Sequence, residues 1–224
     1  MHSGPIGPPP DAAELRRLAQ MLADQYGEIM TYPTSWKRYC DAVGHVEPSQ
    51  YGFNADNADI NRWAARYRAA RAFRGVVLEG YSDSTNGGYS GFCQVFFTWS
   101  AFERFLSLTG LDQSRSAGLF TSDDSERIGA QVAELDSDGR LYNFIHARCN
   151  RPNQEELQKW KNAEPHNFTY LVSAIRHVFV HGYLTPHADG AIPGNNTEIC
   201  NLVSDHVLDV MDWEFTQRIE SFYA

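Results

Sequence analysis

The chain has 224 residues, of which 42% are hydrophobic and 13% aromatic, a composition that excludes a disordered chain. Its length suits one large domain, or one domain with an appendage. With 19 basic and 28 acidic residues its formal net charge is −9, which excludes a protein that coats nucleic acid non-specifically. A small basic site on an acidic body is still compatible with this charge.

The sequence contains neither an evident secretory signal nor a membrane span. The first ten residues are rich in glycine and proline, and no segment reaches the roughly 18 apolar residues of a membrane helix. The four cysteines lie far apart and form no CxxC pair, which is typical of reduced thiols and not of a disulfide framework. We therefore expect a cytoplasmic protein that has no membrane contact.

Composition and spacing divide the chain into three parts. Residues 1–10 are expected to be flexible because glycine and proline dominate them. Residues 11–56 are expected to form an N-terminal helix followed by an irregular segment, in which Trp36 and Tyr39 anchor one helical turn. Residues 57–224 are expected to form a helical bundle.

Apolar residues recur at helical spacing throughout the third part. An apolar stripe predicts a long helix from Asn57, and its members are Ile60, Trp63, Tyr67 and Ala70. A more apolar helix is expected from Phe92 to near Gly110. Between them, the serine- and glycine-rich segment 82–88 predicts a break. Further helices are expected around residues 122–135, 141–145, 153–160, 167–182 and 197–222.

These patterns also indicate the fold class. No segment alternates polar and apolar residues over the length of a strand, and the sequence has no internal repeat. The sequence therefore predicts an all-α fold, an antiparallel helical bundle with an N-terminal helical extension.

The segment from Arg176 to Gly182 carries the most informative chemistry. It places Arg176, His177 and His181 on a helix whose other positions are apolar, and Gly182 is a natural end for that helix. An ideal helix separates Arg176 from His181 by about 140° and about 7.5 Å along its axis, so both can border a cleft wide enough for a phosphodiester. An arginine that holds phosphate and a histidine that titrates near neutrality suit phosphodiester cleavage, and an RNA 2′-hydroxyl as nucleophile makes a metal unnecessary.

An arginine followed by a polar residue, with a histidine five residues after the arginine, resembles the signature of HEPN domains. Arg176, His177 and His181 carry this resemblance, and their position on a penultimate long helix is similar to that family too. HEPN domains are helical bundles. Many of them are metal-independent endoribonucleases in which two protomers bring their motifs together across a dimer interface. The resemblance thus implies a HEPN-like bundle that cleaves RNA at a composite site.

The resemblance also implies roles and partners. Arg176 would bind the scissile phosphate, His181 would act as general acid and base, and His177 would orient the RNA or His181. RNA would be the substrate of a homodimer that uses no metal and no cofactor. For a member of a toxin or defence system, the resemblance further implies an antitoxin or regulatory protein as partner.

Two other interpretations of the motif stay open. Arg176 and His181 can be structural, the arginine in an ion pair and the histidine capping carbonyl groups at the helix end. His177 and His181 also have the i, i+4 spacing that chelates zinc, although Val178 stands where a metalloprotease motif needs glutamate. Further zinc ligands would come from histidines and aspartates that follow in the sequence: His187, Asp189, Asp205 and His206.

Positive charge is unevenly distributed, because 16 of the 19 basic residues are arginines and five of these lie within residues 62–74. Arg62 and Arg66 are expected to bind substrate as part of an RNA-facing ridge. The alternative is a solvated helix face whose arginines pair with acidic neighbours. Glu103 lies on a very apolar helix, so it is a candidate buried partner for Arg176.

The alternative function is a non-catalytic helical module for dimerisation or nucleotide binding. It predicts no turnover of any RNA and tolerance of His181→Ala. It also predicts a loss of association when Val178 or Phe179 is altered. Incubation with RNA in EDTA separates the two functions, and it tests the metal interpretation as well.

Overall fold

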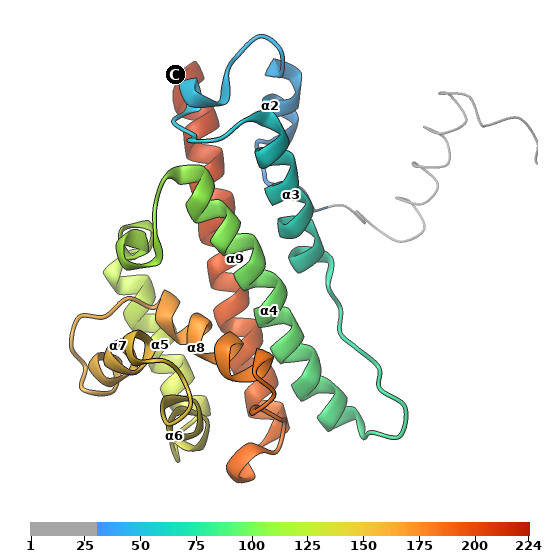
Figure 1. Cartoon of the computed structure of the whole chain (residues 1–224), viewed down its shortest axis with the longest axis vertical. Coiled ribbons are helices and arrows are strands. Elements are labelled where there is room, and N and C mark those ends of the chain that lie inside the picture. Colours follow the sequence, from blue (N-terminus) through green and yellow to red (C-terminus); the bar gives the residue numbers. More distant parts are fainter. Residues whose placement is uncertain (1–30) are drawn as a thin grey trace, which may run out of the picture. The chain divides into compact units, whose positions relative to one another are not determined.

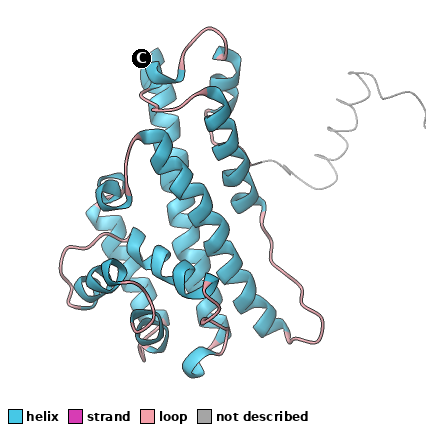
Figure 2. Ribbon diagram, in the orientation of Figure 1, coloured by secondary structure: helices cyan, strands magenta, loops and turns pink. Residues whose placement is uncertain are grey.

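The computed structural model describes residues 31–224, and residues Tyr32–Ala224 form one compact unit. The expected flexible start and the helix expected after residue 10 lie outside the described residues. Every regular element of the described part is a helix, which confirms the predicted all-α bundle (Figure 1, Figure 2). In chain order the elements are α2 (Trp36–Ala42), η1 (Pro48–Tyr51), α3 (Asn57–Ala72), α4 (Asp83–Thr109), η2 (Gln113–Leu119), α5 (Ser122–Leu135), α6 (Arg140–His146), α7 (Arg151–Lys161), α8 (Thr169–Val180), η3 (Ala188–Gly190) and α9 (Pro193–Tyr223).

The core is built around the two longest helices, α4 and α9. A Cβ added to Gly91 of α4 would lie 3.0 Å from the Cβ of Cys200 on α9, so the two backbones approach closely there. Further along, the Trp63 ring contacts Phe105 of α4 and Phe215 of α9, with ring centroids 5.2 and 4.9 Å away. Residue numbers rise together along these contacts, so α4 and α9 run parallel (Figure 1). The expected antiparallel packing does not extend to this pair, because α5 to α8 form a long crossover between them.

The helix α4 begins immediately after Ser82, so the expected break over residues 82–88 is wrong. The hydroxyl oxygen of Ser82 caps the helix by accepting a hydrogen bond from the N–H of Thr85 at 3.3 Å. The glycines of this segment serve close packing: a Cβ on Gly88 would lie 2.6 Å from the Cβ of Pro186. This tertiary contact outweighs the low helix propensity of glycine, which costs about 1 kcal/mol per residue.

The helix α3 packs antiparallel against α4. The side-chain amide of Gln94 donates to the carbonyl oxygen of Ala70 at 3.0 Å, near the end of α3, while Arg104 pairs with Asp59 near its start. The predicted apolar stripe is confirmed, since its members are all at most 1% exposed: Ile60, Trp63, Tyr67 and Ala70.

The segment before α3 packs with the bundle. Trp36 and Tyr39 lie on the helical turn predicted for them, which is α2. Their ring centroids lie 6.0 and 5.9 Å from that of Phe215 on α9. Residues 32–56 therefore belong to the same compact unit as residues 57–224.

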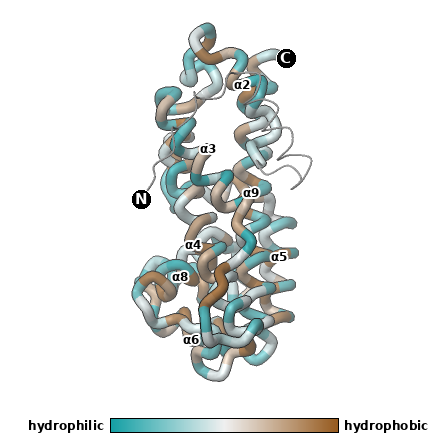
Figure 3. The backbone as a smooth tube through the Cα atoms, turned by 90° about the vertical axis from the view of Figure 1, so that its right-hand side faces the viewer, coloured by the Kyte–Doolittle hydropathy of each residue, from teal (hydrophilic) through white to brown (hydrophobic). Residues whose placement is uncertain are grey.

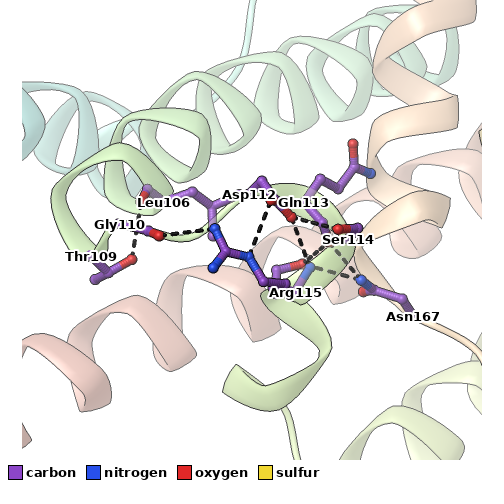
Figure 4. Close-up of polar contacts among 9 residues, drawn as sticks. Leu106, Thr109, Gly110, Asp112, Gln113, Ser114, Arg115 and Asn167 are labelled. Atoms are coloured by element: carbon purple, nitrogen blue, oxygen red, sulfur yellow. Dashed lines mark hydrogen bonds and ion pairs between the residues drawn. The ribbon is translucent and has the colours of Figure 1, made fainter.

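A polar network holds the start of α8. Asn167 Oδ1 accepts hydrogen bonds from the backbone N–H of Thr169 at 3.1 Å and from its hydroxyl at 2.8 Å. Asn167 Nδ2 donates to the carbonyl oxygen of Gln113 on η2 at 2.8 Å. The Asp112 carboxylate accepts bonds from the N–H and Nε of Arg115, which orders η2 itself (Figure 4). These bonds tie the start of α8 to the segment that follows α4.

The helix α8 ends where the sequence predicts. Gly182 has a φ of +76°, a left-handed conformation that glycine adopts without strain, and its N–H donates to the carbonyl oxygen of Phe179 at 2.9 Å. The final helix begins at Pro193, four residues before the expected Thr197, because proline suits the first turn of a helix.

Apolar and polar residues are interspersed along α4 and α9, as expected of helices that bury one side (Figure 3). In the part of the chain that the structure describes, no helix combines the length and apolar character needed to cross a membrane. The four cysteines are free, and Cys149 and Cys200 among them are buried.

Candidate functional site

The motif residues lie at the C-terminal end of α8. Arg176 and His177 belong to its last turns, and His181 is the residue that caps it. Ile175 and Val178, on the opposite side of the helix, have no exposed surface and fix α8 in the core. The buried face of α8 thus fixes the helix, and the three polar side chains of the motif lie at its surface-exposed end.

A second apolar contact positions this end of α8 on α4. The ring of Phe179 lies 5.4 Å from that of Phe92 between centroids, and the chain after the helix passes over Gly88. Pro186, the residue seated on Gly88, belongs to the segment that leads into α9. The site is thus built where α4, α8 and the segment between α8 and α9 meet.

The two imidazole rings of the motif contact each other. Their centroids are 4.5 Å apart and their planes differ by 61°, so the edge of one ring meets the face of the other. His181 is exposed, whereas His177 is half-buried. Burial, followed by the neighbouring charges of His181 and Arg176, lowers the pKa of His177. His177 is therefore biased toward the neutral form, which can accept a hydrogen bond.

Arg176 has no acidic partner within the described residues. Its guanidinium makes no ion pair there, and its Nε is buried without a hydrogen-bond partner. By contrast, Arg71 pairs with Asp209 and Arg104 pairs with Asp59. An arginine whose charge is not neutralised locally is available to an anion such as a phosphate.

The candidate partner Glu103 does not pair with Arg176. Glu103 is exposed and forms no ion pair with any described residue. It lies eleven residues beyond Phe92 on α4, which is about 16 Å along the helix axis. No carboxylate of the described residues pairs with Arg176, so the interpretation of Arg176 as one half of a structural ion pair gains no support.

The arginines of α3 form a separate surface. Arg62 pairs with Asp59, which also binds Arg104, and Arg66 donates to the carbonyl oxygen of Arg62 at 3.2 Å. Arg104 and Phe92 are twelve residues apart on α4, so Arg62 is separated from the motif by about 18 Å along that helix. Figure 1 shows α3 and α8 on opposite sides of α4. Arg62 and Arg66 do not border the motif, and their role in substrate binding stays a prediction.

The zinc interpretation gains no support from the arrangement of the described residues, where no group of three histidine, cysteine, aspartate or glutamate side chains is close enough to hold a metal. Nε2 of His187 lies 3.2 Å from the hydroxyl of Thr85. His206 packs against Phe120 and Phe168.

No family model, curated protein or solved structure matches this chain. A function for this chain is therefore inferred from the arrangement of the residues at the site.

Exposed apolar side chains near the end of α8 and on α4 were not predicted from the sequence. Val180 and Tyr183, which flank His181, are 47% and 59% exposed, and Phe96 lies one helical turn from Phe92 with 39% exposed. Helical spacing includes Phe96 in the apolar pattern of its helix, whereas Tyr183 follows the helix expected over residues 167–182 and has no spacing signal. Only the positions of the neighbouring helices show that these three reach the surface.

Proposed function

We propose that this chain is a metal-independent endoribonuclease of HEPN type. The observation that carries the proposal is an arginine without an acidic partner beside two contacting imidazoles, at the exposed end of a buried helix. A guanidinium binds a phosphodiester through two parallel hydrogen bonds, and imidazoles exchange protons near neutral pH. The same three residues carry the resemblance to HEPN domains.

In this proposal the RNA supplies its own nucleophile. The 2′-hydroxyl attacks the adjacent phosphorus and loses its proton to a neutral imidazole of His181. The bond from phosphorus to the 5′-oxygen breaks, and a protonated imidazole donates a proton to that leaving oxygen. Arg176 stabilises the extra negative charge on the phosphate during the exchange. His177 orients His181 through their ring contact.

One base and one acid are needed for this reaction, and a homodimer supplies two copies of His181. The apolar side chains around the motif suit such an interface: Phe96, Val180 and Tyr183 are all exposed in the single chain. Their burial by a second copy would bring two motifs together across a two-fold axis.

The decisive experiment measures cleavage of a mixed RNA by the full chain in EDTA. Wild type is expected to cleave, and His181→Ala is expected to lose at least about 100-fold in rate, because the proton-transfer group is removed. His45→Ala is the matched control, since His45 is exposed and outside the motif. Cleavage that survives His181→Ala would overturn the mechanism, and cleavage that stops in EDTA would overturn its metal independence.

A second variant tests the role of Arg176. Arg176→Lys keeps the positive charge but loses the planar fork of the guanidinium. We expect a fall in cleavage rate of about 10- to 100-fold with an unchanged fold, measured by the same assay and by circular dichroism. An unchanged rate would mean that Arg176 acts only through its charge or not at all.

A non-catalytic dimerisation module is the second candidate, and the exposed side chains of Val180 and Tyr183 favour it. Substitutions of Val178 or Phe179 do not test association cleanly. Val178 has no exposed surface and Phe179 packs on Phe92, so changing either one disturbs the core. Tyr183→Ser is expected to dissociate a dimer without unfolding it, as measured by light scattering. A dimer without any RNA turnover would favour the module over the enzyme.

A further inference from the structure

A cavity of about 680 Å³ lies among η2, α5, α7 and the segment that leads into α8. Small residues of α5 form one wall, namely Gly129, Ala130 and Ala133. The aromatic rings of Phe120 and Trp160 contribute to the remaining lining. Sites for small organic molecules commonly span about 300 to 1,000 Å³ and combine apolar walls with a few polar groups. The cavity therefore has the size and lining of a ligand site.

The sequence of α5 explains how Trp160 comes to line this cavity. Ile128 and Val132 are buried in the core, so the helix is anchored by one side. On another side, a Cβ at Gly129 would lie 2.9 Å from the indole nitrogen of Trp160. A larger residue at position 129 would displace the indole. Glycine thus lets Trp160 stand against α5 and form part of the lining.

Carboxylates outnumber basic groups in the cavity lining. The lining contains two carboxylates, Glu126 and Glu164, one imidazole, His166, and neither lysine nor arginine. Nδ1 of His166 lies 3.0 Å from the backbone carbonyl oxygen of Glu164, so this contact does not occupy the carboxylate of Glu164. Glu126 makes no ion pair or hydrogen bond with any described residue. The carboxylate of Glu164 accepts one hydrogen bond, from the side chain of Asn162 at 2.9 Å. Two carboxylates that pair with neither lysine nor arginine, beside a single imidazole, disfavour a phosphate or carboxylate ligand and favour a cation.

The aromatic part of the lining favours the same ligand class. The Trp160 ring packs edge-on against Tyr142, with centroids 5.8 Å apart, and its N–H donates to no described residue. Among aromatic side chains, tryptophan binds cations most strongly through its ring face. The small residues of α5 leave room for an apolar body beside it.

We infer that this cavity binds a small organic cation, a protonated amine attached to a flat apolar body. The apolar body lies between the α5 wall and Trp160, and the amine lies beside Glu126. The cavity and His181 lie at opposite ends of α8, because the cavity lining reaches the segment before Thr169 and His181 follows Val180. The twelve residues of α8 between them span about 18 Å. Binding in the cavity does not depend on the proposed RNA cleavage.

Three probes with one shared body test the chemistry. Calorimetric titration of the full chain compares 4-phenylbutylamine, which is protonated at pH 7, with the neutral 4-phenylbutanol and the anionic 4-phenylbutyrate. We expect saturable binding of the amine, about tenfold tighter than the alcohol, and no saturable binding of the carboxylate. Equal affinities for all three, or no binding of the amine, would overturn the inference.

Two variants locate the binding. Ala133→Phe fills the cavity from an exposed position of α5 and is expected to abolish amine binding, whereas Ala69→Phe, at an exposed position of α3, is the matched control and is expected to leave it unchanged. Glu126→Gln keeps the side-chain shape and is expected to reduce the affinity of the amine to that of the alcohol. The Glu126→Gln result decides the matter if Ala133→Phe does not fold. Binding that both variants leave intact would show that the amine binds elsewhere.

Discussion

His206 is a histidine buried between two phenylalanine rings. It is 9% exposed, and its ring centroid lies 5.4 Å from that of Phe120 and 5.4 Å from that of Phe168. Its Nε2 is buried without a hydrogen-bond partner. Burial lowers the pKa of His206, and the nearby carboxylate of Asp124 opposes this effect in part. The folded chain therefore favours the neutral ring.

This burial predicts a loss of stability in mild acid. As the pH falls through about 6.5, His206 of the unfolded chain takes up a proton, while the folded chain resists until its lower pKa is reached. The free energy of unfolding therefore falls across that range. We expect His206→Leu to reduce the difference in unfolding free energy between pH 7.5 and pH 5, as measured by urea denaturation. His45→Ala, at an exposed position, is expected to retain the full difference, and an equal change in both variants would contradict the assignment to His206.

Some features of the motif are visible in the sequence, and others depend on the tertiary structure. Arg176 and His181 are identifiable from their spacing, but the absence of an acidic partner for Arg176 in the described residues depends on helices far away in sequence. The contact of His177 with His181 follows from an i, i+4 spacing and is visible in the sequence. The solvent exposure of Tyr183 is not, because it depends on what the neighbouring segments leave uncovered.

At the scale of elements, α4 shows how tertiary packing overrides local preference. The glycines of its first turns predict a break, yet they are helical because Pro186 lies against Gly88 and Cys200 against Gly91. Glycine removes the side chain that would keep these segments apart. A low local helix propensity and a close tertiary contact thus have the same cause.

Replacing glycine by alanine is expected to have opposite effects at two helical positions, because one of them is in close tertiary contact and the other is not. Gly88→Ala forces a Cβ into Pro186 and is expected to lower the free energy of unfolding by about 1–3 kcal/mol, despite the better helix propensity of alanine. Gly194→Ala, in the first turn of α9 with no atom within 4 Å of the added Cβ, is expected to raise it by about 0.5 kcal/mol. Urea denaturation of both variants checks the signs. A stabilising Gly88→Ala would show that the segment carrying Pro186 moves away at little cost.

At the scale of the whole molecule, the proposed enzyme depends on two copies of the chain. If each site needs residues from both copies, a dimer of wild type and His181→Ala is inactive. Random exchange in an equal mixture leaves about one quarter of the dimers fully wild type. We expect the cleavage rate of that mixture, at constant total protein, to approach about one quarter of the wild-type rate.

Independent sites give a different result in the same experiment. If each chain cleaves RNA alone, the mixture retains half of the wild-type rate, in proportion to the wild-type chains it contains. A mixture prepared with His45→Ala in place of His181→Ala is the control and is expected to keep the full rate. Retention of half the rate after complete subunit exchange would reject the composite site.

The net charge of −9 belongs to this scale too. It disfavours bulk binding of nucleic acid, and many of the arginines that offset it in part are paired with acidic neighbours, such as Arg62 with Asp59 and Arg71 with Asp209. Arg176 lacks such a partner within the described residues. A local phosphate site on an acidic molecule is therefore consistent with both the composition and the arrangement of charges.

The sequence by itself determined the helical class, the buried stripe of α3, the end of α8 at Gly182 and the presence of the Arg176–His181 motif, because each is set by residues within a few helical turns. Only the tertiary structure decided that α4 and α9 run parallel, that segment 82–88 is helical, that the α3 arginines lie away from the motif, and that a cavity opens beside Trp160. These features depend on contacts between residues that are distant in the chain. Periodicity reports which side of a helix is apolar, but it does not report which helix will cover that side or leave it open.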